Sequence, residues 1–359
     1  MRCGRRRRAS GDGREGMKRL IVALLTVCGL TASAQVPAAF GEKDDVDKAV
    51  ERGLAYLAKI QNDSGFFPEE YGKTTGVVSL GGMAFLAKGY LPGRPPYGDV
   101  LNRCIDYVIS NQMDNGLLAK ADQRMYSHAI STLFLCEVSG MVDAVRQKKL
   151  DEVLPKAVKL ILSAQQVPKA QDQKGGWRYT PTSNDSDMSC TGWALMALRS
   201  ARLNGAPVPD KAIIDAVNYI MNHCDTNQGT FGYQDKSNGA TKLTGAGLLC
   251  LELTGHHGEE VTLKAGNFIL NNHEGLPGDG YAAYGNYYNA QGMFQLGGKY
   301  WTKYSTWMYA TWLPKQREDG SWPPSNIGVA YETAMVLLAM TVPYRQLPIY
   351  QRDETVDEQ

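Results

Sequence analysis

Acids, a histidine and hydroxyl groups recur in this sequence just before or within short apolar helical patterns. The clearest case is the run Gly-Gly-Trp-Arg-Tyr at 175–179, which is followed by Asp185 and Asp187 and then by an apolar helix. Glu332 lies among small apolar residues, and burial there would raise the pKa of its carboxyl group. Asp187 and Glu332 are therefore the carboxylate pair best suited to acid/base chemistry, with Asp185 and His128 as further catalytic candidates.

The same residues also have structural interpretations. Asp185 or Asp187 can cap the helix that follows. His128 and Glu332 can be hydrogen-bonded residues without a catalytic role.

Candidate ligand-binding residues share this position near helix starts: Tyr126, Ser189, Tyr284, Tyr287, Tyr288, Gln291 and Tyr331. Tyrosine rings in such a cluster can stack on a sugar, hold an isoprenoid or stabilise a cation by their faces. They can equally pack between helices, and the sequence leaves these alternatives open.

The elements that must position these residues form a repeat. A turn of the form Gln-x-x-x-Gly-x-aromatic occurs at 61–67 and 316–322, with relatives at 112–118, 166–177 and 223–231. Each turn separates an amphipathic helix from a helix of small and apolar residues, at intervals of about 50 residues, which indicates a repeat architecture.

The two kinds of helix differ in how much surface they should bury. One kind alternates charged and apolar residues and should show one face to water: 45–60, 98–111, 151–165, 210–223, 259–272 and 301–315. The other kind is apolar or small all round and should be buried: 78–86, 129–135, 192–198, 244–251, 290–296 and 330–338. The sequence therefore predicts an all-α fold, an α/α toroid (α6/α6 barrel) of about six helical hairpins. Its hollow is expected at the N-terminal ends of the inner helices, where converging helix dipoles favour an anion.

Composition and the termini set the wider limits. Formal net charge is +1 with 43% hydrophobic and 21% charged residues, so we expect no nucleic-acid partner. Residues 17–34 have the basic, apolar and small-residue layout of a secretory signal, with translation starting at Met1 or Met17. The predicted organisation is 1–34 extension and signal peptide, 35–44 linker, 45–342 toroid and 343–359 extended tail. The protein is expected to be exported, to the periplasm or outside the cell.

Two further expectations concern the cysteines and the tail. Cys104, Cys136, Cys190, Cys224 and Cys250 should be buried thiols, although a Cys104–Cys136 disulfide is open to an exported protein. The proline-containing tail from 342 should wrap the outer surface and become disordered beyond Asp353.

The repeated turns, best at 61–67 and 316–322, resemble those of squalene-hopene cyclases and protein prenyltransferase β subunits over residues 45–342. This resemblance implies the same α/α toroid. The cyclases place an aspartic acid proton donor in an Asp-x-Asp-Asp-Thr-Ala motif, whereas the matching residues here are Asp187, Ser189 and Cys190, so the donor is replaced by serine. The prenyltransferase zinc site implies Asp187, Cys190 and His128 as a weak zinc candidate, and otherwise no cofactor.

Three functional hypotheses follow. The first is an exported toroid that binds a small apolar or amphipathic, isoprenoid-like ligand without the cyclase proton donor, with peripheral membrane association as an option. The second is an enzyme: a terpenoid cyclase or transferase, or a toroidal polysaccharide lyase or hydrolase. The third is a scaffold for a protein partner. A cavity lined by Leu, Phe and Met would favour a lipid, one lined by Tyr, Asp and His a sugar, and a filled core the scaffold.

Overall fold

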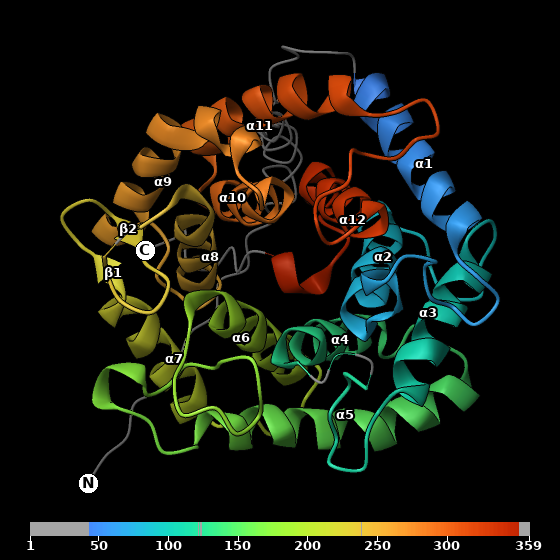
Figure 1. The fold of residues 1–359 in the computed structure, drawn as a ribbon, viewed down its shortest axis with the longest axis horizontal. Coiled ribbons are helices and arrows are strands. Elements are labelled where there is room, and N and C mark those ends of the chain that lie inside the picture. The colour runs from blue at the N-terminus through green and yellow to red at the C-terminus, as the bar shows by residue number, and fades with distance from the viewer. Residues whose placement is uncertain (1–42, 121, 123, 238, 352–359) are drawn as a thin grey trace, which may run out of the picture. The chain divides into compact units, whose positions relative to one another are not determined.

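Twelve α-helices alternate between two concentric layers in the part of the chain that the computed structural model describes, residues 43–351 apart from 121, 123 and 238. The outer layer contains α1 (Lys43–Ile60), α3 (Gly98–Ser110), α5 (Ala144–Gln165), α7 (Asp210–Asn222), α9 (Glu260–Asn272) and α11 (Gly298–Trp312) (Figure 1). The inner layer contains α2 (Thr75–Lys88), α4 (Met125–Val138), α6 (Met188–Leu203), α8 (Thr241–Glu252), α10 (Ala282–Leu296) and α12 (Val329–Met340). The predicted α/α toroid is confirmed.

Short elements connect these helices. The 3₁₀ helices are η1 (Tyr71–Lys73), η2 (Gln171–Gln173), η3 (His273–Gly278), η4 (Leu313–Lys315), η5 (Val342–Tyr344) and η6 (Pro348–Tyr350). Strand β1 (Cys224–Asp225) pairs antiparallel with β2 (Thr230–Phe231), with Cys224 opposite Phe231. The predicted signal peptide at 17–34 and the tail beyond Asp353 lie outside the described residues.

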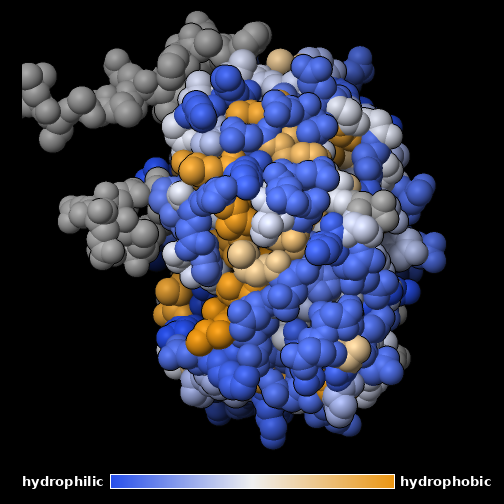
Figure 2. Space-filling view, turned by 90° about the vertical axis from the view of Figure 1, so that its left-hand side faces the viewer, coloured by the Kyte–Doolittle hydropathy of each residue, from blue (hydrophilic) through white to orange (hydrophobic). Residues whose placement is uncertain are grey.

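Burial separates the two layers as the helical patterns predict. In α2 every residue from Thr75 to Ala87 is buried, whereas α3 buries one face through residues such as Leu101, Cys104 and Ile105. Figure 2 shows the outer wall on the side of α7 and α9 as mostly hydrophilic, with hydrophobic residues in a narrow strip. The hydrophobic core therefore lies between the layers and within the inner ring.

The repeated glutamines clamp successive outer helices together. The Gln61 side-chain amide donates to Gly65 O (3.1 Å) and to Val100 O (3.2 Å) at the start of α3. Gln112 does the same with Gly116 O (3.1 Å) and Val153 O (3.0 Å) in α5. Each such turn thus satisfies its own backbone and holds the next outer helix.

The third and last clamps follow the same plan. In the third, Gln165 donates to Gly175 O (2.9 Å) and to Ala212 O of α7 (2.8 Å), one residue before the Gln166 that the sequence pattern suggested. In the last, the Gln316 amide donates to Gly320 O (2.9 Å) and Ala49 O of α1 (2.7 Å), which closes the outer ring.

Helix starts differ most from the predicted ones at two places. Helix α5 begins at Ala144 rather than 151, because Asp143 accepts from the backbone N–H groups of Val145 and Arg146 and caps it. Helix α10 begins at Ala282 rather than 290, so its tyrosines are spread along a helix instead of gathered before it. This second difference decides where several candidate site residues lie.

The tail prediction is wrong for residues 342–351. After α12 the chain turns into the ring of inner helices, where Figure 1 shows it as a red segment near the centre. Leu347, Ile349 and Tyr350 are buried there. These apolar side chains gain more from burial than they would from lying on the outer wall.

The five cysteines in the described part of the chain are free and buried. The alternative of a Cys104–Cys136 disulfide is therefore wrong, and the thiols pack as small apolar side chains. Among the described residues, no helix combines the length and apolar character needed to cross a membrane.

Candidate functional site

Asp187 is the N-cap of α6, as one interpretation of the sequence predicted. Its Oδ1 accepts from the backbone N–H of Cys190 (2.8 Å) and from the Ser189 hydroxyl (2.6 Å). Its side chain is fully buried, and its Oδ2 pairs with the Arg178 guanidinium at 2.9 Å. Asp185, which is partly exposed, pairs with the same guanidinium at 3.3 Å. A buried carboxylate is stable here because a cation and two hydrogen-bond donors surround it.

Tyrosines extend this ion pair into a polar ring. Arg178 also donates to the Tyr233 hydroxyl (2.8 Å), which is hydrogen-bonded to the Tyr179 hydroxyl. The guanidinium lies over the rings of Tyr179 (4.3 Å) and Tyr233 (5.3 Å). The Arg178 side chain is thereby fixed by its two carboxylate partners and by the two aromatic rings that it contacts.

Tyr126 closes the ring from α4. Its ring stacks on Tyr179 with centroids 6.2 Å apart, and its hydroxyl interacts with the nearby Ser189 side chain. The N-terminal rim is the name used below for this set at the starts of α4, α6 and α8: Tyr126, Arg178, Tyr179, Asp187, Ser189 and Tyr233. Its residues come from segments up to about a hundred positions apart in the chain, which the inner helices bring together.

His128 has a structural position instead of a place in the rim. Its Nδ1 accepts from the backbone N–H of Leu118 (3.0 Å), and its Nε2 donates to Ala157 O of α5 (3.1 Å). The ring is fully buried, and burial lowers the pKa of His128 to about 4. Both nitrogens are occupied by backbone groups, so this neutral imidazole joins α4 to α5 and has none left for a substrate.

Two carboxyl groups, one half-buried and one buried, hold a proton more tightly than an exposed acid does. Burial raises the pKa of Glu332 in α12 and of Asp122, just before α4. Asp122 accepts from the Ser127 hydroxyl (2.5 Å) and the Arg124 backbone N–H (3.1 Å). A raised carboxyl pKa is what a general acid requires, so both are candidates for that role.

The tyrosines of α10 point into the inner ring at different depths. Tyr284 lies in the first turn of α10, close enough to Asp187 and Tyr331 to interact with them electrostatically. Tyr288 packs against Tyr284, with centroids 4.8 Å apart. The hydroxyls of Tyr284 and Tyr288 are buried without a protein hydrogen-bond partner. Such atoms in a polar setting point to a bound water or ligand group.

Tyr287 and Gln291 lie farther along α10 than the sequence suggested. Tyr287 hydrogen-bonds to Tyr350 of the C-terminal segment, and Gln291 lines a pocket there with Leu338 and Arg345. The reason is the early start of α10, which places these residues in the second and third turns of the helix.

The zinc candidate of Asp187, Cys190 and His128 is not assembled. Within the described ranges, no three His, Cys, Asp or Glu side chains are grouped so that they could hold a metal ion. Asp187 is committed to Arg178 and the helix cap, and His128 to two backbone groups.

Four residues of interest were not among the candidates from sequence: Arg178, Tyr179, Tyr233 and Asp122. A signal for two of them was present. Tyr179 follows the turn aromatic Trp177 by two residues, and Tyr233 follows Phe231 by two, so both occupy the same place in the repeat. Equal repeat positions on neighbouring hairpins lie side by side in a toroid, which would have paired them.

Comparison with known proteins supports the fold and leaves the family open. No family description and no curated protein matches the chain. An inactive variant of an α-1,6-mannanase from Salegentibacter sp. HEL1_6, with two aspartic acids substituted and α-1,6-mannotriose bound, is similar at TM-score 0.60 and 10% identity. That alignment covers 82% of this chain and 98% of the mannanase.

A second similar structure has a different chemistry. A type II terpene cyclase from Scytonema, bound to geranylgeranyl dihydroxybenzoate, gives TM-score 0.53 at 11% identity, covering 85% of this chain and 98% of the cyclase. A protein from Klebsiella pneumoniae described as a possible member of the GH105 family gives TM-score 0.55 at 13% identity, covering 85% and 94%. At these identities the likeness shows a shared α/α toroid fold and no shared activity.

Proposed function

We propose that this chain binds a carbohydrate at the N-terminal rim. The observation that carries the proposal is the hydrogen-bonded chain of Ser189, Asp187, Arg178, Tyr233 and Tyr179. Tyr126 adds an aromatic face to this chain, because its ring stacks on Tyr179. Sugars present apolar ring faces and many hydroxyls, and tyrosine offers a flat apolar body with a polar tip. Pre-positioned polar groups beside aromatic faces are what such a ligand requires.

The side chains at the rim favour a sugar over an isoprenoid. The candidates there are tyrosines, acids and an arginine, whereas an apolar chain would need an aliphatic tunnel. Deeper in the ring, Trp193 stacks on Tyr287 with centroids 5.3 Å apart, and Tyr350 packs behind them. Packed rings there leave the polar rim as the better place for a ligand.

Binding can be tested by calorimetry with α-1,6-mannotetraose and a panel of other neutral and acidic oligosaccharides. Tyr233→Phe removes one rim hydroxyl and should weaken binding about fivefold, the equivalent of roughly 1 kcal/mol. Tyr90→Phe is the matched control, because it removes a hydroxyl that donates to Glu51 at the other end of α2. No saccharide binding, together with tight binding of a geranylgeranyl amphiphile, would replace this proposal by the apolar-ligand hypothesis.

Glycoside hydrolysis is a second candidate function. It is favoured by the raised pKa values of Asp122 and Glu332, since hydrolysis needs a protonated carboxyl near a second carboxylate. If either is the acid, Asp122→Asn or Glu332→Gln should abolish release of reducing ends from a bound oligosaccharide while leaving its affinity within about threefold. Hydrolysis that survives both changes would exclude these two acids.

A further inference from the structure

The C-terminal segment, residues 346–351, is held in the toroid mainly by side chains that grip its backbone. Arg199 of α6 donates to Ile349 O (2.7 Å), and the Ile349 N–H donates to Glu137 of α4 (3.1 Å). Gln295 of α10 donates to Tyr350 O (2.7 Å). Three inner helices thus bind the backbone of two consecutive residues near the end of the described chain.

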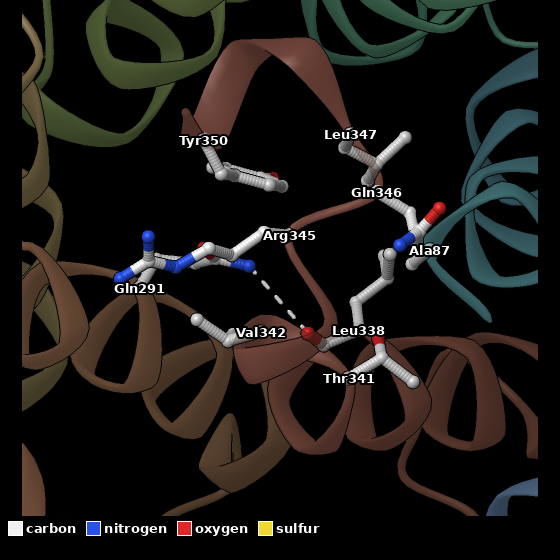
Figure 3. Close-up of a pocket in the computed structure, with 9 residues that line it drawn as sticks. All are labelled: Ala87, Gln291, Leu338, Thr341, Val342, Arg345, Gln346, Leu347 and Tyr350. Carbon is white, nitrogen blue, oxygen red and sulfur yellow. Dashed lines mark hydrogen bonds between the residues drawn. The ribbon is translucent and has the colours of Figure 1, made fainter. Parts of the chain in front are cut away.

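Side-chain contacts complete the seat. The Tyr350 hydroxyl bonds to Tyr287, and Leu347, Ile349 and Tyr350 are buried. A cavity of about 10 Å³, enough for about one water molecule, remains beside the segment, lined by residues including Ala87, Gln291 and Leu338 (Figure 3). Arg345, at the bend into the segment, has a left-handed backbone (φ 52°), which is unfavourable for a residue with a side chain. The segment is therefore bound specifically and closely packed, and the backbone of Arg345 at its start is the unfavourable feature.

Glu137 joins the segment to the ring through one buried carboxyl group. Its Oε1 accepts from the Ser200 hydroxyl (2.5 Å) and its Oε2 from Ile349 N–H (3.1 Å). Burial raises the pKa of Glu137 to about 6, against the lowering effects of Ser200, Ile349 and Arg199.

The other ionisable groups that face Glu137 keep one charge state through this range. Burial raises the pKa values of Cys136, Tyr287 and Tyr350, so these groups stay neutral in acid and at neutral pH. Arg199 of α6 stays protonated. Glu137 is thus the group of this set that titrates between mildly acidic and neutral pH.

We propose that residues 346–351 form a proton-controlled plug, which seats in the C-terminal end of the toroid when Glu137 is protonated and is released more readily when it ionises. The seated state buries Glu137, whereas release exposes its carboxyl group to water. Because burial disfavours the charged form, the seated state holds a proton more tightly than the open state. Seating therefore takes up a proton and weakens as pH rises.

The size of the effect follows from the two states of one carboxyl group. With a pKa of about 6 when seated and the ordinary value of 4.5 when open, the seating equilibrium should weaken by up to about 30-fold across the titration. Access to the ring from this end would then increase towards neutral pH. The plug does not depend on the proposed sugar site, which lies at the opposite ends of the inner helices.

Hydrogen exchange of the full chain tests this, with rates corrected for intrinsic exchange at each pH. From about pH 4.5 to about pH 7.5, protection of the 346–351 amides should fall more than about tenfold, while their exchange stays faster than that of buried α4 amides. Glu137→Gln keeps an acceptor oxygen but cannot ionise, so its segment protection should not change with pH. Tyr350→Phe is the matched control: it should lower protection at both pH values and keep the dependence on pH.

Three results would overturn the proposal. One is equal segment protection at both pH values in the unmodified chain. Another is a fall with pH that persists in Glu137→Gln. The third is exchange of the segment only together with the buried amides of α4, because the plug would then open only when the whole toroid unfolds.

Discussion

The two ends of the inner helices use the same residue types in different ways. At the N-terminal rim, Arg178 binds the carboxylate of Asp187 and the hydroxyl of Tyr233, and these groups remain beside the partly exposed Tyr179. At the C-terminal end, Arg199 and Glu137 bind the backbone of Ile349 instead. One end thus keeps polar groups beside partly exposed tyrosines, while the other satisfies its polar groups with the chain itself. An arginine, an acid and tyrosines do not by themselves define a binding site. Whether they can bind a ligand depends on whether other parts of the chain already take up their hydrogen bonds.

The largest effect should come from removing the cation at the rim. Arg178→Ala leaves Asp187 buried without its partner and should destabilise the fold by about 3–5 kcal/mol. Arg146→Ala is a matched control, because Arg146 also pairs with two acids, Asp106 and Asp143, but both are substantially exposed. It should cost about 1 kcal/mol or less in urea unfolding. Equal losses for the two variants would show that burial of Asp187 does not matter.

His128 should make the fold sensitive to acid. Its pKa is about 4 in the folded state and 6.5 when unfolded, so the unfolded chain binds a proton first as pH falls. The stability that it contributes is present above about pH 6.5 and is lost as pH falls through about 4, with a total of roughly 3 kcal/mol. Free energies of unfolding measured across this range should show the slope, and His128→Gln should remove it. An unchanged slope would assign the acid sensitivity to other groups.

Glu137 lies on the same helix, α4, and should act with the opposite sign. Because its pKa is raised in the folded state, its contribution is complete below about pH 4.5 and is lost as pH rises through about 6. Relative to Glu137→Gln, the unmodified chain should lose roughly 2 kcal/mol of stability over that range. A difference between the two proteins that does not vary with pH would contradict this.

The smallest effects should separate the two ends by function. Tyr350→Phe removes a buried hydrogen bond to Tyr287 and should cost about 1 kcal/mol of stability without changing ligand affinity. Tyr233→Phe removes a hydroxyl from a half-buried residue and should change stability by about 0.5 kcal/mol or less while it weakens saccharide binding. Thermal unfolding and calorimetry on the same two variants would show that one mainly loses stability and the other mainly loses saccharide affinity. Both variants losing only stability would make the N-terminal rim a structural network.

Local patterns in the sequence predicted the layers and part of the site. The alternation of charged and apolar residues separated α3 from α2, since a helix buried all round cannot carry charges along it. The spacing from Gln61 to Gly65 predicted a repeated turn, and the structure shows that it clamps neighbouring helices. The position of Asp187 before an apolar helix predicted the N-cap that is found. These features depend on residues close together in the chain.

The roles of single residues were harder to predict from sequence. A residue's role depends on how far along an inner helix it lies, and that position depends on where the helix starts. His128 and Asp187 both precede apolar runs, yet one bonds to two backbone groups and the other to an arginine. Tyr287 and Gln291 lie deeper in the ring than predicted because α10 starts eight residues earlier than predicted. An error in one helix boundary moves a residue along the axis by about 1.5 Å for each position.

Amphipathic periodicity, turn spacing and helix caps are local, and the sequence alone was enough to predict a toroid of alternating outer and inner helices. The closure of the C-terminal end of the ring by residues 346–351 was decided only by tertiary structure. Glu137 and Ile349 are 212 positions apart, and Arg199 and Ile349 are 150 apart. Contacts at such separations leave no periodic trace in either segment. They form because a closed ring brings the last residues of the described chain to the inner helices, where burial of Leu347, Ile349 and Tyr350 stabilises them.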